Sequence, residues 1–334
     1  MKRRNRLALA SQPLHAPDEA ERPWTGPDGQ VMRRLELHVT WTCPERCVFC
    51  SEDHRMAAFS PFAATWSRLS QVIRKHAERG VEAVHFTGGE PTIHPRFVDL
   101  LALARSLGMR TSVGTIGTML ARPDFARRAV PLLDEALFSL HAPNAALHDA
   151  LARRDGSFDT VTRAIAAARE LAPGFRAAVN TVVTRRNIEV LPDTVALAAE
   201  LGVGLIIVSN TTPEGAALDA YDDLAVPLSD LARVLPTVPA RAGDAIVRFF
   251  GVPMCLLGPH RMLSNDLHWD PRVTAEWTRQ PGRVVFDDLY NWRPDRKRTH
   301  VAACSDCAMS GLCTGVYAEY ADRFPVDALT PLGE

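Results

Sequence analysis

Seven cysteines in this chain of 334 residues fall into two groups, one near each end. The first group has three members with C-x3-C-x2-C spacing: Cys43, Cys47 and Cys50. The second has four members, the last three of them with C-x2-C-x5-C spacing: Cys255, Cys304, Cys307 and Cys313. An odd number of thiols in a chain without a secretory signal argues against a disulfide framework, so the cysteines indicate metal binding or catalysis.

The first group suits a [4Fe–4S] cluster that is incompletely ligated by protein. Such a cluster usually takes four thiolates, so three leave one iron open to a substrate or cofactor. The alternative is a zinc site, which needs four ligands, and His54 is the only obvious fourth nearby. The second group has the four thiols of one closed tetrahedral site, which makes structural zinc its simplest interpretation.

The composition is that of a globular protein, with 46% hydrophobic and 23% charged residues. A formal net charge of −1, from 38 basic and 39 acidic residues, gives no general attraction to nucleic acid or an anionic membrane. The apolar run at residues 7–10 is too short for a secretory signal, and no segment has the apolar length of a membrane span. We therefore expect a soluble cytoplasmic protein without a nucleic-acid or membrane partner.

The elements that position these cysteines alternate between strands and helices. Six β-rich runs are predicted to be strands: 35–39, 83–87, 110–113, 136–140, 176–183 and 204–209. Helices are predicted between them, and three of these end at Gly80, Gly108 and Gly202. The alternation predicts βαβ units and a parallel sheet. Six units favour a partial (β/α)6 barrel, with a doubly wound open sheet as the alternative, and both place ligands at the carboxyl ends of the strands.

Three regions follow from this pattern. Residues 1–33 are rich in proline and polar residues and are predicted to form an arm. Residues 34–210 hold the alternating elements. The alternation stops in residues 211–334, which contain the second cysteine group and are predicted to form an extension that covers the mouth of the barrel. The cysteine loop at residues 43–50 follows the first strand and therefore lies at this mouth.

The cysteine loop and a second motif, Thr87-Gly-Gly-Glu-Pro91 at the end of the second strand, together resemble the radical SAM superfamily. The resemblance implies a [4Fe–4S] cluster on the three thiolates, with S-adenosylmethionine (SAM) chelating the open iron. It implies that Gly88, Gly89 and Glu90 hold the ammonium group of SAM. Phe49, which precedes the third cysteine, would lie near the adenine, with a packing role in the loop as the alternative.

Other matches to the superfamily are weaker. Ser139, at the end of the fourth strand, and Asn180, in the fifth, stand where relatives contact SAM. His141 is either a hydrogen-bonded structural residue or a substrate contact. Thr115 stands before Ile-Gly where relatives have Asn-Gly, and this difference weakens a role for Thr115 in SAM binding. Arg153 or Arg154 is a candidate for binding the SAM carboxylate.

The second cysteine group, with Gly315 close by, resembles the SPASM or Twitch extension of radical SAM enzymes. The full SPASM pattern continues with a cysteine where this chain has Tyr317, so the resemblance implies a single auxiliary [4Fe–4S] cluster on all four cysteines. The assignment of Cys255 as a ligand rests on the count of cysteines and on its Pro-x-Cys context. A free Cys255 would leave an open iron that binds substrate, or would provide a hydrogen-atom donor.

The resemblance implies reductive cleavage of SAM to a 5′-deoxyadenosyl radical that abstracts a hydrogen atom from substrate. Auxiliary-cluster relatives often modify ribosomally made peptides, so a peptide is the first expectation and small-molecule tailoring the second. A non-catalytic metal-binding adaptor is a remote alternative. Expected partners are a flavodoxin- or ferredoxin-type electron donor and a separate leader-binding protein, because residues 1–30 are too short for a winged-helix recognition domain. The basic run at 293–298 is a solvated loop or a docking patch for the donor.

Overall fold

The computed structural model describes residues 31–291 and 297–333, so most of the predicted arm at residues 1–33 lies outside the described residues. Nine strands form one sheet in the order β7-β6-β5-β4-β3-β2-β1-β8-β9. The strands are β1 (Arg34–Thr40), β2 (Ala83–Gly88), β3 (Arg110–Thr115), β4 (Glu135–Ser139), β5 (Arg176–Val183), β6 (Leu205–Asn210), β7 (Ile246–Phe250), β8 (Arg272–Gln280) and β9 (Arg283–Asn291). All neighbouring pairs are parallel except β8 and β9, which form an antiparallel hairpin.

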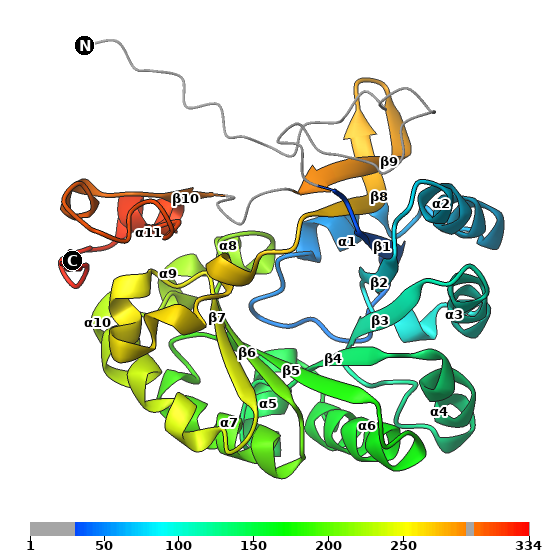
Figure 1. Ribbon diagram of the computed structural model, residues 1–334, viewed down its shortest axis with the longest axis horizontal. Coiled ribbons are helices and arrows are strands. Elements are labelled where there is room, and N and C mark those ends of the chain that lie inside the picture. The colour runs from blue at the N-terminus through cyan, green and yellow to red at the C-terminus, as the bar shows by residue number, and fades with distance from the viewer. Residues whose placement is uncertain (1–30, 292–296, 334) are drawn as a thin grey trace.

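Most of the helices that connect the parallel strands lie on the outer side of the sheet, which curves without closing (Figure 1). The helices of this part are α1 (Asp53–Phe59), α2 (Trp66–Glu78), α3 (Phe97–Ser106), α4 (Pro123–Ala129), α5 (Ala145–Ala152), α6 (Ser157–Leu171) and α7 (Leu191–Glu200). Leu69 and Ile73 of α2 and Val161 and Ile165 of α6 are fully buried in the main core, because their spacing puts them on one face of each helix. The architecture is an α/β partial barrel.

All six predicted strands are present, but the parallel sheet continues past them. After β6 the chain forms three short helices, α8 (Ala216–Asp219), α9 (Tyr221–Leu224) and α10 (Leu228–Val234), and returns as β7 parallel to β6. These helices have four to seven residues, too few for a clear periodic signal in the sequence. The boundary predicted at residue 210 stays a prediction, although β7, β8 and β9 from beyond it belong to the same sheet.

The two faces of the sheet differ in chemistry. Along β7, Val247 and Phe249 are buried in the core under the outer helices, whereas Arg248 and Phe250 lie on the opposite, concave face and are half-buried. The same alternation runs through the other strands, because successive side chains point to opposite faces. The concave face is therefore where polar side chains from several strands meet.

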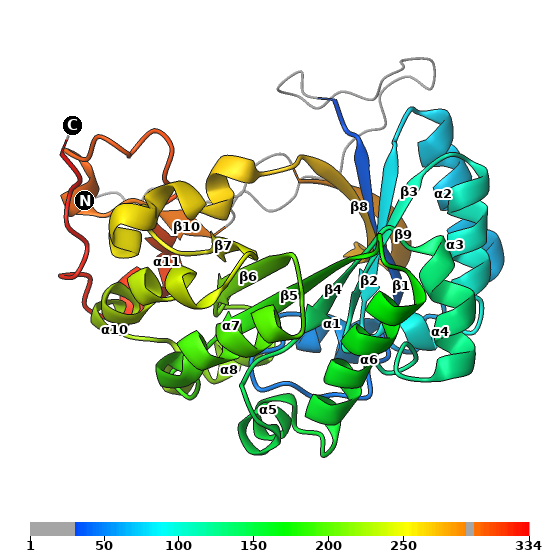
Figure 2. The same ribbon diagram turned by 60° about the horizontal axis from the view of Figure 1, so that its bottom comes forward.

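The C-terminal region packs at the β7 end of the sheet, away from the β8–β9 hairpin (Figure 2). It contains β10 (Arg298–Thr299), β11 (Val316–Tyr317) and α11 (Ala318–Arg323). The Tyr320 hydroxyl accepts a hydrogen bond from the Leu228 amide of α10 at 3.1 Å, which ties α11 to the barrel. No helix among the described residues is long and apolar enough to cross a membrane.

Candidate cofactor site

The first cysteine loop follows β1 and is anchored by backbone hydrogen bonds to two distant segments. The amides of Arg46 and Val48 donate to the carbonyls of Ala152 and Leu151, at the end of α5, at 3.1 and 2.9 Å. The Cys50 carbonyl accepts from the Ala216 amide, at the start of α8, at 2.9 Å. These contacts hold the loop at the mouth of the barrel.

Gly88 and Gly89 bring the second motif into direct backbone contact with the segment that leads into the cysteine loop. The amides of Gly89 and Glu90 donate to the carbonyls of Thr40 and Thr42 at 2.7 and 2.9 Å. A Cβ on Gly88 would lie 2.3 Å from the Thr40 oxygen, and one on Gly89 would lie 2.3 Å from the Thr42 oxygen. Only glycine permits this approach, so the two motifs form one unit.

The Glu90 side chain is fully buried and holds four hydrogen bonds. Its Oε1 accepts from the Thr115 hydroxyl at 2.8 Å and from the Thr92 amide at 3.1 Å, and also from the Thr92 hydroxyl. Among the described residues, its Oε2 accepts from the Ile116 amide alone, at 2.8 Å. Burial raises the pKa of the Glu90 carboxyl, and the hydrogen bonds from Thr92, Ile116 and Thr115 oppose that rise. Thr115, which is followed by Ile116 where relatives have Asn, thus positions Glu90, a role that needs the β2–β3 register and that the sequence did not indicate.

The three thiols of the loop are poorly solvated. Burial raises the pKa of Cys43 to about 12, that of Cys50 to about 11, and that of Cys47 well above its usual value, each reinforced by neighbouring acidic groups. Backbone N–H groups of Glu45 and Glu52 hydrogen-bond to Cys43 and Cys50 and partly oppose the rise. A cationic metal centre would favour the thiolate form of such groups, so this donor set fits a metal cluster.

The geometry does not favour a single zinc ion in the loop. Tetrahedral zinc with bonds of about 2.3 Å to sulfur needs sulfur atoms about 3.8 Å apart. Within residues 31–291 and 297–333, the one group of three metal-binding side chains with ligand atoms all within 4.8 Å contains no cysteine. His54, the local fourth ligand that zinc would need, is instead hydrogen-bonded to Asp219 at 2.7 Å.

Glu45, which lies within the loop, makes contacts that the spacing of the cysteines did not predict. Its carboxyl group is buried, accepts a hydrogen bond from the Cys47 thiol at 3.4 Å, and is also bonded to the Ser157 hydroxyl at the start of α6. Ser157 in turn lies 3.4 Å from Nε2 of His148. These contacts join the loop to both α5 and α6.

Phe49 and His141 pack against each other with ring centroids 4.6 Å apart. Phe49 is only 7% exposed and belongs to a small apolar cluster with Val48 and Leu151, which is the packing role given above as the alternative to an adenine contact. His141 accepts a hydrogen bond from the Val182 amide at 3.2 Å, and burial lowers the pKa of its imidazole well below the usual value. These contacts are those of a structural histidine.

Ser139 and Asn180 lie side by side on the concave face, because they are register partners in β4 and β5. Asn180 accepts a hydrogen bond from the Ser209 hydroxyl of β6 at 2.6 Å. Of the two candidate arginines, Arg153 is exposed, whereas Arg154 is half-buried and contacts the Thr118 hydroxyl at 3.4 Å. Among the predicted SAM contacts, Ser139 on β4 is two strand positions away from the glycine motif on β2, and Asn180 on β5 is three positions away.

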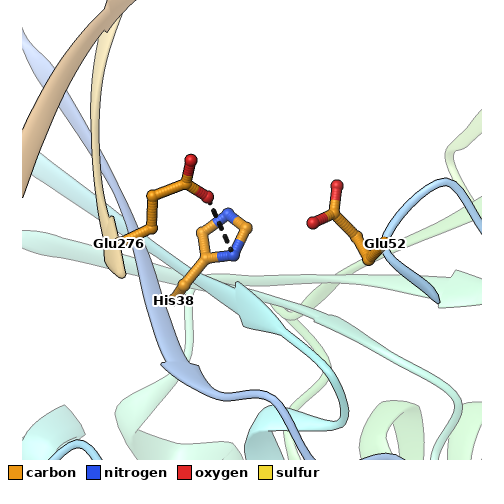
Figure 3. A group of neighbouring side chains, drawn as sticks. All are labelled: His38, Glu52 and Glu276. Carbon is orange, nitrogen blue, oxygen red and sulfur yellow. Dashed lines mark ion pairs between the residues drawn. The ribbon is translucent and has the colours of Figure 1, made fainter. Parts of the chain in front are cut away.

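A second group of polar side chains lies where β1 meets β8. Figure 3 shows His38 of β1 and Glu276 of β8 turned toward each other, with Glu52 opposite them. His38 Nδ1 lies 3.5 Å from Glu276, and both side chains are at least 95% buried. The Arg55 guanidinium donates to Glu276 at 2.7 and 3.0 Å and to Glu52 at 3.3 Å. Arg55 therefore provides the positive charge that these carboxylates need.

The second cysteine group is brought together from two segments. Cys255 follows β7 and lines one pocket with Cys304, Cys307 and Cys313, together with His300. Backbone amides point at the sulfur atoms: those of Met254 and Gly315 lie 3.4 and 3.3 Å from Cys313 Sγ. Burial and the neighbouring Cys313 and Cys304 raise the pKa of the Cys255 thiol to about 11.

This pocket is supported by a buried ion pair. Arg298 Nε donates to the Gly315 carbonyl at 2.9 Å, and its guanidinium lies 3.5 Å from Asp266, with both side chains 1% exposed. Arg298 belongs to the basic run that was predicted to be a solvated loop, and its burial shows that this prediction is wrong for Arg298. Residues 293–296 of the run lie outside the described residues. Tyr317, which replaces the further cysteine of the SPASM pattern, is buried with its hydroxyl 3.1 Å from that of Thr212.

Comparison with known proteins agrees with this geometry. Residues 37–198 match the family model of the Radical SAM superfamily. The chain is a partial α/β barrel with a three-cysteine loop at its mouth, and over residues 37–198 it is similar to the radical SAM superfamily.

Among curated proteins, the PqqA peptide cyclase of Gluconobacter oxydans is 35% identical over 182 residues, which cover 53% of this chain and 49% of the relative. That of Rhodopseudomonas palustris is 30% identical over 206 residues, 61% of this chain and 53% of the relative. The chain thus spans about half the length of the curated relatives it matches.

Solved structures share the fold at low sequence identity. Native anSMEcpe with bound AdoMet superposes with a TM-score of 0.60 at 15% identity, covering 89% of this chain and 93% of that one. Streptococcus suis SuiB bound to the precursor peptide SuiA gives a TM-score of 0.55 at 19% identity, covering 69% of this chain and 51% of that one. These likenesses show that the partial barrel is a known fold.

Proposed function

We propose that this protein is a radical SAM enzyme that modifies a peptide. The observation that carries the proposal is the backbone contact of Gly88 and Gly89 with Thr40 and Thr42, which fixes the Gly-Gly-Glu motif beside the three-cysteine loop. When bound, a reduced [4Fe–4S] cluster supplies the electron that cleaves SAM to methionine and a 5′-deoxyadenosyl radical, which abstracts hydrogen from substrate.

The residues of the chain have separate tasks in this proposal. Cys43, Cys47 and Cys50 provide three thiolates, and the mouth of the barrel leaves the fourth iron position to SAM. Glu90 Oε2 accepts a single hydrogen bond in the structure, so it has a lone pair left for the ammonium group of SAM. Ser139 and Asn180 lie on the concave face, where they would contact the rest of SAM, and Phe49 orders the loop.

An auxiliary [4Fe–4S] cluster on Cys255, Cys304, Cys307 and Cys313 is the second part of the proposal. It is supported by the single pocket that all four cysteines line and by the amides directed at Cys313 Sγ, since such hydrogen bonds stabilise cluster thiolates. With all four thiols used as ligands, none is left as a hydrogen-atom donor. The auxiliary cluster would instead accept an electron from the substrate radical.

The peptide substrate is supported by the relatives, which are named as cyclases of the peptide PqqA. We propose a flavodoxin- or ferredoxin-type protein as the electron donor and a separate protein for leader-peptide binding. The alternative is that the enzyme modifies a small molecule. It is tested in the same reaction with small molecules in place of the peptide.

Anaerobic reconstitution tests the cofactor assignment. The protein is loaded with iron and sulfide, reduced with dithionite and given SAM, and we expect about eight irons per chain and release of 5′-deoxyadenosine. Cys304→Ala/Cys307→Ala/Cys313→Ala should lower the iron content toward about four, and zinc at this site in place of iron would contradict an auxiliary cluster. Absence of 5′-deoxyadenosine under every reducing condition would favour a metal-binding adaptor.

The substrate is tested with short peptides encoded beside the gene. We expect a mass change in one of them that requires SAM, reductant and the three cysteines of the loop. A mass change confined to small metabolites of the producing cell would favour the small-molecule alternative.

A further inference from the structure

The concave face of the sheet carries three half-buried arginines: Arg34, Arg248 and Arg272. Two of them are paired with carboxylates of the chain. Arg272 lies 3.2 Å from Glu36, and Arg34 lies 3.9 Å from Asp270. Pairing of this kind is the rule for charges removed from water, because an unpaired one loses hydration without compensation.

Arg248 is the exception. Its guanidinium donates one hydrogen bond, from Nη1 to the Val247 carbonyl beside it at 3.1 Å. In the described part of the chain, no carboxylate lies within ion-pair distance of it. A guanidinium has five N–H donors in a planar fork, so most of those of Arg248 are left for a ligand.

The strand register places Arg248 between the two cysteine sites. Ser139, Asn180, Ile207 and Arg248 are successive register partners across β4, β5, β6 and β7. Neighbouring strands are about 4.8 Å apart, so Arg248 lies roughly 10 Å beyond Asn180 along this row. Two residues after Arg248, β7 ends and leads through Pro253 and Met254 to Cys255 in the second pocket.

The geometry points to Arg248 as the binding residue for a carboxylate of the substrate, an inference that rests on the proposed function. The carboxylate of SAM does not fit this position. SAM carries its ammonium and carboxylate on one carbon atom, and the ammonium is assigned to the glycine motif on β2, five strands away from β7. A second molecule must therefore provide the anion.

The neighbours of Arg248 define the kind of anion. Ile207 is its register partner, and Ile246 and Phe250 flank it on the same face, so the neighbours of Arg248 along and across the strand are apolar. One guanidinium matches a monoanion, and its fork matches the two oxygens of a carboxylate. In a peptide substrate this group is an Asp or Glu side chain or the C-terminal carboxylate.

The test uses the reconstituted holoenzyme with SAM and peptides that differ only in charge. The first pair is acetyl-Gly-Gly-Glu-Gly-Gly-amide and its Gln counterpart, and the second pair is pentaglycine with a free and an amidated C-terminus. Wild-type protein should bind one acidic member about tenfold more tightly than its neutral partner. The pair that shows the preference identifies the source of the carboxylate.

Arg248→Gln should abolish this preference, and Arg248→Lys should retain part of it because lysine keeps the charge but loses the fork. Arg110→Gln is the matched control. Arg110 is exposed at the start of β3, the end of the strand away from the mouth of the barrel, so its replacement should leave the preference unchanged. Melting temperature and iron content are measured for each variant to establish that it folds.

Three outcomes would overturn the inference. The first is a wild-type protein that binds acidic and neutral peptides equally or prefers inorganic phosphate. The second is a preference that survives in Arg248→Gln. The third is a large loss of SAM affinity in Arg248→Gln, which would assign the residue to SAM. Peptide binding is measured without turnover, so it does not depend on SAM cleavage. If the protein prefers the acidic peptide but forms no 5′-deoxyadenosine, the proposed function is contradicted and the role of Arg248 is not.

Discussion

The two cysteine sites are built in opposite ways. The first takes its three thiols from residues 43–50, a loop fixed by backbone contacts to β2, α5 and α8. The second takes one thiol from residue 255 and three from residues 304–313, and its support is the buried pair of Arg298 and Asp266. The first is a local loop on a rigid sheet, whereas the second forms only when the C-terminal chain returns to the end of β7.

This difference predicts how independently the sites assemble. The first needs only the strand ends that the barrel already provides. The second must close a segment of about fifty residues, which costs conformational entropy, and it depends on charged groups that are buried only in the folded state. Damage to the second site should therefore leave the first intact more readily than the reverse.

The largest expected effect comes from removing the thiols of the first site. Cys43→Ala/Cys47→Ala/Cys50→Ala should reduce 5′-deoxyadenosine formation to background and leave about four of about eight irons. Iron analysis and chromatography of the nucleoside products measure both. The matched control, Cys304→Ala/Cys307→Ala/Cys313→Ala, should lose the other four irons and still release 5′-deoxyadenosine. Equal loss of all iron in both variants would refute independent sites.

The next effect concerns the buried ion pair of the second site. Arg298→Met leaves Asp266 buried and unpaired and removes the hydrogen bond to the Gly315 carbonyl, so we expect a loss of about 3–5 kcal/mol in the free energy of unfolding. Denaturant titration and iron analysis measure the result. Arg298→Met/Asp266→Leu should recover part of the stability because it removes the unpaired charge. A double variant as unstable as the single one would show that the ion pair is unimportant.

The sequence contained enough to predict the first site and only part of the second. The six strands, the loop after β1 and the glycine motif after β2 follow from local patterns, and parallel strands bring such loops to one edge. The count of cysteines also indicated Cys255 as the fourth ligand. Its place beside the other three depends on β7, whose five residues are too few for a strand to be predicted from the hydrophobic pattern.

What the sequence missed depends on contacts between distant segments. Arg298 belongs to a charged run, and its burial follows from Asp266, 32 residues earlier in the chain. The role of Thr115 follows from the pairing of β2 with β3, which puts its hydroxyl next to Glu90. Glu45 was one of three residues between two cysteines, and only the position of α6 shows that Ser157 reaches it.

A smaller effect tests the backbone contact that joins the two motifs of the first site. Gly88 and Gly80 both have positive φ, +117° and +83°, but a Cβ on Gly88 would meet the Thr40 carbonyl whereas one on Gly80 would meet nothing within 4 Å. Gly80→Ala should cost about 1–2 kcal/mol from the backbone conformation alone. Gly88→Ala should cost about 2–4 kcal/mol and also weaken SAM cleavage. Equal stability and equal 5′-deoxyadenosine yield in the two variants would refute the steric argument.

The smallest effect we predict concerns the Thr115 hydroxyl in the first site, which donates to Glu90 Oε1 and accepts from the Gly117 amide at 2.9 Å. Thr115→Val keeps the shape of the side chain but removes the 2.8 Å bond to Glu90 Oε1, so Glu90 is less firmly held, and SAM affinity should fall by a few-fold. Thr111→Val, at the other end of the same strand, removes a hydroxyl bonded to the Leu132 carbonyl. Thr111→Val should lose about 1 kcal/mol of stability and Thr115→Val about 1–2 kcal/mol, because the Thr115 hydroxyl makes a second buried hydrogen bond, with the Gly117 amide. An equal change in SAM affinity in both variants would show that Thr115 acts through general stability. A change confined to Thr115→Val would show that Thr115 supports SAM binding by positioning Glu90.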